Sequence, residues 1–210
     1  MSVRLYRSLG VLVGVTSSLV VVGWMADVSV LKSLLPGQTV IPANCSITWA
    51  LAGWALFLTS LQSRWLRMLG RVLALLVTLT GAVTLATTLL SIDPLDAVYL
   101  QPRAESVAIS FPGQMLLQES VPFMLIGIAL LLLSIQKASL RIVCCVLAVA
   151  AMAPSIQALV GYVLSKPDLF TFCTTGECAR LHLMLALTSI TLCLSIFFYA
   201  KPSKQQTAAL

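Results

Sequence analysis

Short charged stretches divide this chain into long apolar segments, and the sign of the charge alternates from one stretch to the next. The acidic residues lie in or beside three of the stretches: Asp27; Asp93, Asp96, Glu105 and Glu119; Asp168 and Glu177. Basic clusters lie at the other ends of the apolar segments: Arg4 and Arg7; Arg64, Arg67 and Arg71; Lys137 and Arg141; Lys201 and Lys204. Because Lys and Arg stay on the cytoplasmic side during insertion, the pattern predicts six membrane spans with both termini in the cytoplasm.

The composition supports this interpretation and excludes a soluble enzyme. The chain is 59% hydrophobic and only 10% charged, whereas a soluble domain has about 25% charged residues. Six spans of about 20 residues each leave no room in 210 residues for a separate soluble domain. The net charge of +6 comes mainly from the basic clusters, which orient the chain and meet anionic lipid, so we expect no nucleic-acid partner.

The apolar segments predict an all-α integral membrane fold of six transmembrane helices, paired as three hairpins. The predicted spans are approximately 8–25, 44–63, 70–90, 117–135, 141–163 and 179–200. Pro154 falls inside the fifth span, where it removes one helical hydrogen bond and is expected to kink the helix. Trp49 and Trp54 lie deep in the second span and are interpreted as packing residues, with stacking on a ligand as the alternative.

The three hairpins resemble copies of one unit in a pseudo-threefold arrangement, over about 8–63, 66–135 and 139–200. Two motifs recur in the first two units: Pro36-Gly37-Gln38 with Pro112-Gly113-Gln114, and Gly53-x-Ala55-Leu56 with Gly127-x-Ala129-Leu130. The second pair is 74 residues apart, and at that offset Asn44 pairs with Gln118. At an offset of 138, Asn44 pairs with His182. Copies in one orientation predict an axis along the membrane normal; the alternative is that apolar hairpins with turns of this kind resemble one another without duplication.

A larger set of short motifs extends over nearly the whole chain. It comprises Gly23-Trp24, Leu34-Leu35-Pro36-Gly37, Asn44, Leu51-Ala52-Gly53-Trp54-Ala55-Leu56, Leu76, Gly81, Ile92-Asp93, Pro112-Gly113-Gln114-Met115 and Gly127-Ile128-Ala129-Leu130. Together these motifs resemble the MASE-type membrane-associated sensor modules, which precede histidine kinase, PAS, diguanylate cyclase or phosphodiesterase domains in bacterial signalling proteins. This chain departs from that pattern after the turn, where Asn-Thr-Ala is replaced by Asn44-Cys45-Ser46 and Gln118-Glu119-Ser120.

The resemblance implies a non-enzymatic sensor domain over residues 1–200 of a multi-pass bacterial inner-membrane protein, with residues 201–210 as a cytoplasmic tail or linker. The partners it implies are the lipid bilayer, a cytoplasmic effector domain or partner kinase, a small or lipophilic ligand, and a second copy of the chain in a homodimer. A signal at the outer face would shift the first and sixth helices relative to the cytoplasmic output. The residues indicate no particular cofactor.

Four polar residues are expected near the outer ends of the even-numbered spans: Asn44, Gln118, Glu119 and His182. Polar groups at membrane depth are costly and are often functional, and the N-termini of helices favour an anionic group. We therefore predict that the four residues surround one outward-facing ligand cavity, with His182 and Glu119 as the discriminating residues. The alternative is that they are interfacial residues with ordinary water or backbone partners.

Cys173 and Cys178 belong to the segment Cys-Thr-Thr-Gly-Glu-Cys in the third outer loop. That loop faces an oxidising space in the predicted topology, so a local disulfide across the turn is expected. A free redox-active pair is one alternative. A metal site with His182 is another, for which Cys45 and Met184 are the only nearby further ligands.

Two other functions compete with the sensor hypothesis. A small-molecule transporter would need a polar path that continues past the middle of the membrane, and the sequence contains no such path. A thiol oxidoreductase that uses Cys173 and Cys178 with a quinone would need a second reactive pair in another outer loop. No phosphate-binding loop, nucleophile elbow or His-Glu-x-x-His motif occurs.

Overall fold

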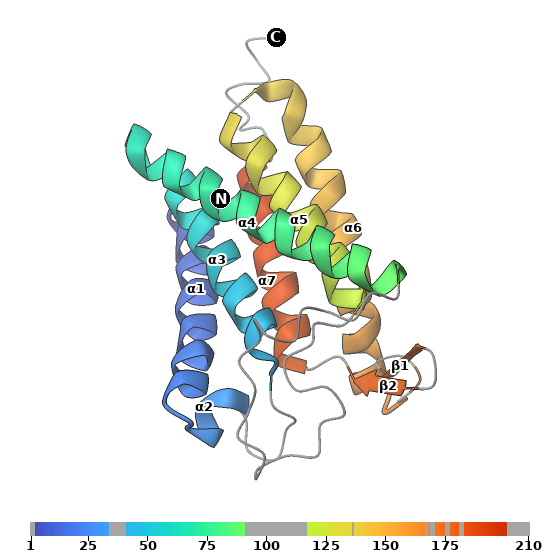
Figure 1. Ribbon diagram of the computed structural model, residues 1–210. Helices are drawn as coiled ribbons and strands as arrows, with labels where there is room; N and C mark the ends of the chain where they lie inside the picture. Colours follow the sequence, from blue (N-terminus) through green and yellow to red (C-terminus); the bar gives the residue numbers. More distant parts are fainter. Residues whose placement is uncertain are drawn as a thin grey trace.

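The computed structural model describes residues 3–33, 41–90, 117–135, 137–166, 168, 171–174, 177–180 and 183–200. Its helices are α1 Val3–Met25, α2 Ser29–Ser33, α3 Ala43–Thr59, α4 Arg64–Leu89, α5 Leu117–Ile135, α6 Ala138–Val163 and α7 Leu183–Ala200. A short antiparallel hairpin, β1 Thr171–Thr174 and β2 Glu177–Arg180, precedes α7. In Figure 1, α2 and this hairpin lie toward the same end of the helix bundle.

Three central helices, α3, α5 and α7, form the middle of the bundle, and each contacts the other two. Three peripheral helices surround them: α1 packs against α3 and α7, α4 against α3 and α5, and α6 against α5 and α7. Within the described residues the peripheral helices do not contact one another. Figure 1 shows α4 running obliquely across the bundle. The helices form a closed ring of contacts, because α1 and α7, the first and last of the described helices, pack together.

The peripheral helices bury narrow stripes of small residues and expose apolar side chains elsewhere. In α4 the buried residues are Gly70, Ala74, Val77 and Gly81, a spacing that places all four on one helical face. Leu75, Leu76 and Leu79 on the remaining surface are 43–49% exposed. An apolar surface of this kind is stable only against lipid or another apolar partner. The buried stripe of small residues therefore explains how α4 packs, and the exposed leucines explain its high hydropathy.

Glycine brings two pairs of helices into close contact. A Cβ atom at Gly53 would lie 2.8 Å from the Cα of Gly14, so α3 approaches α1 backbone to backbone. A Cβ atom at Gly127 would lie 2.6 Å from the backbone nitrogen of Thr78, so α5 approaches α4 in the same way. Small residues at such crossings let helices pack closely in membranes, where apolar burial alone does not drive helix association.

The ends of α3 and α5 receive arginines from the start of the preceding helix. Arg7 donates from Nε to Ser60 Oγ (3.1 Å) and from Nη2 to the Ser60 carbonyl (2.5 Å). Arg71 donates from the same two atoms to Ser134 Oγ (3.1 Å) and the Ser134 carbonyl (2.9 Å). The last carbonyls of a helix have no partner within it and carry partial negative charge, so each arginine caps the C-terminal end of its neighbour.

At the other end of the bundle, α2 folds back against α1. The buried Lys32 pairs with Asp27, and its ammonium lies 5.0 Å from the centre of the Trp24 ring. Trp24 Nε1 donates to the Ile41 carbonyl at 2.9 Å, which ties the chain entering α3 to α1. The one buried lysine among the described residues is therefore paired with a carboxylate, as burial of a charge requires.

Four helices are long and apolar enough to cross a membrane: Leu5–Met25, Arg64–Leu89, Ser139–Val163 and Leu183–Ala200. Apolar helices also occupy the other two predicted spans, but their apolar parts, Ala43–Thr59 and Glu119–Ile135, are shorter. The last span was predicted to begin at about 179, but Glu177–Arg180 pairs with β1 and α7 begins four residues later, at Leu183. The two Pro-Gly-Gln turns lie outside the described residues.

Candidate functional site

The N-terminal ends of the central helices carry buried polar groups in an otherwise apolar core. Cys45 is fully buried in the first turn of α3, and its Sγ donates to Glu119 Oε2 of α5 at 2.5 Å. Glu119 is only 5% exposed. The contact joins two positions that are 74 residues apart, the same offset that aligns the glycine motifs of these helices.

One turn deeper, an aromatic pair and a serine face the axis of the central helices. The rings of Trp49 and Phe123 lie 4.6 Å apart between centroids, tilted by 55°, and these positions are also 74 residues apart. Trp49 Nε1 and Ser189 Oγ are buried and have no hydrogen-bond partner. We refer to Cys45, Trp49, Glu119 and Ser189 as the polar cluster.

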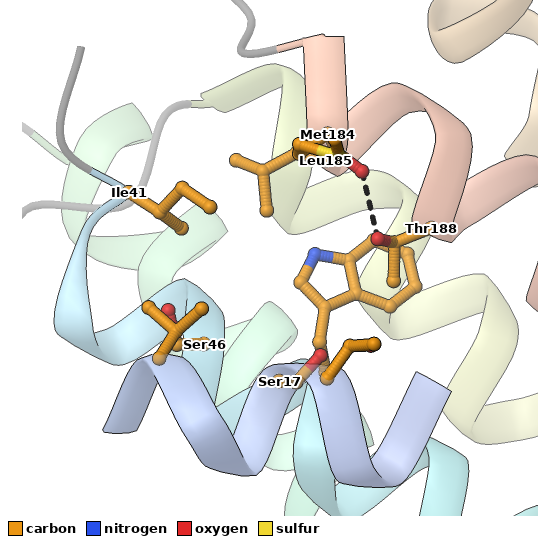
Figure 2. A pocket seen from close by; sticks show the side chains of 9 residues that line it. Ser17, Ile41, Ser46, Met184, Leu185 and Thr188 are labelled. Atoms are coloured by element: carbon orange, nitrogen blue, oxygen red, sulfur yellow. Dashed lines mark hydrogen bonds between the residues drawn. The ribbon is translucent and has the colours of Figure 1, made fainter. Parts of the chain in front are cut away.

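A first small cavity lies beside Trp49, where α1, α3 and α7 meet, and its volume is about 20 Å³. Figure 2 shows Ser17 of α1 and Ser46 of α3 on one side, with Met184, Leu185 and Thr188 of α7 across from them. Thr188 Oγ1 donates to the Met184 carbonyl at 2.7 Å (Figure 2). Because that bond uses the hydroxyl proton, Thr188 offers the cavity an acceptor rather than a donor.

A second cavity of about 10 Å³ lies among α3, α5, α6 and α7. It is lined by Trp49, Glu119, Pro122, Pro154, Ser155, Leu185 and Ser189. Trp49 and Leu185 line both cavities. A water molecule needs roughly 10–15 Å³ by this measure, so each cavity is of water size rather than large enough for a drug-sized ligand.

Further along the axis the core becomes apolar. Trp49, Phe123 and Ser189 are followed at the next inward-facing positions by Ala52, Ile126 and Leu192, and one turn later by Leu56, Leu130 and Ile196. All six of these side chains are fully buried. The polar cluster therefore lies in the N-terminal half of the central helices, whereas the buried hydroxyls nearer their other ends, Thr59, Ser134 and Ser195, each bond to a carbonyl of their own helix.

The structure describes the side chains of two of the four predicted site residues. Glu119 is buried beside Cys45 rather than exposed at an interface. Asn44 is half-buried in the first turn of α3, and its carbonyl accepts a bond from Thr48 Oγ1 at 2.7 Å. The Gln118 side chain and all of His182 lie outside the described residues. The expected gathering of the four residues therefore remains a prediction.

The backbone of the β-hairpin places the two loop cysteines opposite each other. Cys173 pairs with Cys178 in the antiparallel register, and Cβ atoms of directly opposed residues lie about 4.5–5.5 Å apart. A disulfide needs a Cβ separation of about 3.5–4.5 Å. The two ranges meet near 4.5 Å, so a small adjustment of the backbone would allow the predicted local bond. The side chains themselves lie outside the described part, and the disulfide remains a prediction.

Sequence reasoning missed three members of the site. It named Cys45 only as a nearby further ligand for a metal site with His182, treated Trp49 as packing with ligand stacking as the alternative, and did not single out Ser189. The repeat offset carried the missing signal, because an offset of 74 aligns Cys45 with Glu119 as well as Gly53 with Gly127. Among the described residues no group of three His, Cys, Asp or Glu side chains comes together to hold a metal.

No protein-family model, curated protein or solved structure matches this chain.

Proposed function

We propose that the protein is a membrane sensor domain that binds a small or lipophilic signal at the N-terminal ends of its central helices and relays it to a cytoplasmic kinase or cyclic-di-GMP effector. The observation that carries this proposal is the polar cluster. Trp49 and Ser189 keep unpartnered polar atoms inside an apolar bundle. Unpaired polar groups in such surroundings destabilise a fold, and polar residues at membrane depth are commonly functional.

The position of the first cavity supports a route from the site to the output. Ser17 of α1 and Thr188 of α7 both line it, so a ligand that widened this water-sized cavity would move the helices nearest the two ends of the chain. At the other end of these helices the rings of Tyr6 and Tyr199 lie 4.5 Å apart between centroids. A signal that favours one packing of α1 against α7 would shift an attached effector between its inactive and active conformations.

The proposed topology is six spans in three copies of a helical hairpin, with both termini in the cytoplasm. The pattern of helix–helix contacts supports this topology, because each peripheral helix packs against two central ones. The paired caps of Arg7 on Ser60 and Arg71 on Ser134 support duplication of the first two hairpins.

Burial supports a third copy, in a register two residues from the one that pairs Asn44 with His182. Trp49, Ala52 and Leu56 are buried in α3, and the residues 140 positions later in α7 are buried as well. Those residues are Ser189, Leu192 and Ile196. A repeated pattern of buried positions is what duplicated packing units would produce.

The apolar part of the axis favours a sensor over a transporter. A transported polar substrate would have to pass the fully buried side chains of Leu56, Leu130 and Ile196, which offer no hydrogen-bonding groups to replace its water. A sensor has no such requirement, because it passes a change in packing rather than a substrate. Substrate flux in liposomes that contain this chain alone would favour the transporter instead.

The test is the output of a diguanylate cyclase fused after residue 210, measured as cyclic-di-GMP in cells. We expect Glu119→Gln, Trp49→Phe and His182→Ala to change the output several-fold at equal protein levels. Ser195→Ala is the matched control, because Ser195 is buried on α7 and its hydroxyl bonds to the Thr191 carbonyl of its own helix. Equal output from all four variants and the parent would reject the site.

A further inference from the structure

Trp49 is the only described tryptophan whose indole N–H is both buried and unpartnered. The residue is 3% exposed and Nε1 has no hydrogen-bond partner. By contrast, Trp24 Nε1 donates to the Ile41 carbonyl at 2.9 Å, and Trp54 Nε1 donates to Ser18 Oγ at 3.3 Å. An indole nitrogen is a donor only, so the group that completes Trp49 must be an acceptor.

Ser189 departs from the behaviour of its neighbours on α7. Thr188, Thr191 and Ser195 each donate to the carbonyl four residues earlier, at 2.7 Å in every case. Ser189 is 2% exposed, and its hydroxyl makes no such bond. The Cys193 thiol lies within hydrogen-bonding reach of the Ser189 hydroxyl, but sulfur is a weak hydrogen-bond partner. The Ser189 hydroxyl thus remains available to a molecule outside its own helix.

Both residues line the second cavity, together with Glu119. The volume of about 10 Å³ matches one water molecule, and a buried water typically makes two to four hydrogen bonds to protein groups. Pro122 and Pro154 line the same cavity from α5 and α6. A proline inside a helix leaves one backbone carbonyl without its usual helical donor, so helices that carry prolines often recruit water or a side chain near the break.

We propose that this cavity binds one ordered water molecule, which accepts a hydrogen bond from Trp49 Nε1 and shares another with Ser189 Oγ. The water bridges α3 and α7 across the central axis, and the Glu119 carboxyl offers it a further acceptor. The inference starts from the same two unpartnered groups that support the sensor proposal, but its test detects water directly rather than effector output, so either proposal can fail without the other.

The direct test uses the full chain with ¹⁵N-labelled tryptophan in lipid nanodiscs, and the probe is water itself. A water-selective NOE experiment reads each indole Hε1 separately, and Trp49→Phe assigns its resonance. We expect a cross-peak between Trp49 Hε1 and a slowly exchanging water. Trp24 is the internal negative control because its N–H is bonded to a carbonyl. Trp65, which is 79% exposed, is the comparison for a surface indole in the same spectrum.

Substitutions at Ser189 distinguish a cavity that holds a water molecule from an empty one. Ser189→Val fills the space and should abolish the Trp49 cross-peak, whereas Ser195→Ala should leave it intact. Ser189→Ala should lower the melting temperature if the hydroxyl holds the water. It should leave that temperature unchanged or raise it if the hydroxyl is merely unsatisfied, because removal of an unpaired buried polar group is favourable. A Trp49 resonance without any water cross-peak, or an Ser189→Ala variant at least as stable as the parent, would overturn the proposal.

Discussion

The hairpin of α1 and α3 and the hairpin of α4 and α5 share one set of contacts and differ in another. In both, a glycine of the second helix packs against the backbone of the first, and an arginine of the first helix caps the second. The differences lie at the N-terminal ends of the second helices, where Cys45 faces Glu119 and Trp49 faces Phe123. Shared contacts hold helices together in each hairpin, so the positions that differ are the ones free to carry function.

The shared glycine contacts should show the largest effect on stability. Gly53→Val and Gly127→Val each place a side chain against backbone atoms of the neighbouring helix, which cannot move aside as a flexible side chain can. We expect each variant to lose about 3 kcal/mol or more of the free energy of unfolding. Reversible unfolding in mixed detergent micelles measures this quantity.

Gly10→Ala is the matched control for the glycine variants. Its new Cβ would lie 3.3 Å from the Gly53 carbonyl oxygen, on the same seam between α1 and α3, so the two helices would have to separate by only a few tenths of an ångström. If Gly53→Val proved as mild as Gly10→Ala, close backbone approach would not be what holds the first hairpin together. If only one of the two valine variants were severe, the hairpins would not share a packing principle.

The two arginine caps should show intermediate and unequal effects. Arg7 is half-buried, whereas Arg71 is exposed, and solvent weakens charged interactions at exposed sites. We expect Arg7→Gln to cost about 1–2 kcal/mol and Arg71→Gln no more than about 1 kcal/mol. The same unfolding assay, at low salt and at high salt, measures the free energy of unfolding of both variants. A larger loss at Arg71 would mean that lipid headgroups or other groups, rather than Ser134, determine its contribution.

The sequence predicted the helices well because long apolar segments between charged stretches leave few alternatives for a chain in a membrane. The start of the last helix was predicted less well. The residues Glu177–Arg180 resemble the polar beginning of a membrane span, but in the structure they form β2 and pair with β1. The site was predicted in part. Glu119 stood out as a carboxyl beside an apolar segment, but nothing local marks Ser189 as different from Ser195. Only the three-dimensional contacts reveal which of these hydroxyls bonds to its own helix.

Trp49→Phe makes the two hairpins more alike and should have a small effect on stability. The ring contact with Phe123 is retained, while the unpartnered N–H is removed. We expect a change in the free energy of unfolding within about 1 kcal/mol, together with altered output in the cyclase fusion. Phe123→Trp is the reciprocal variant, and because Phe123 is fully buried, the larger ring should overpack the core and cost about 1–3 kcal/mol. Equal tolerance of both changes would show that the aromatic difference carries no constraint.

The smallest expected effect on stability belongs to Cys45→Ser, one of two variants that test the contact between Cys45 and Glu119. A thiol is a weak hydrogen-bond donor, so Cys45→Ala should lose about 1 kcal/mol of the free energy of unfolding, mostly through the small space left at a fully buried position. Cys45→Ser keeps a donor for Glu119 and nearly the same volume, and should remain within about 0.5 kcal/mol of the parent. Measured beside Glu119→Gln, these variants form a double-mutant cycle for the contact between the two hairpins. A coupling energy near zero would mean that Cys45 and Glu119 are neighbours without being partners. A coupling larger than the loss in either cap variant would show that the contact between the two hairpins is stronger than the arginine caps within them.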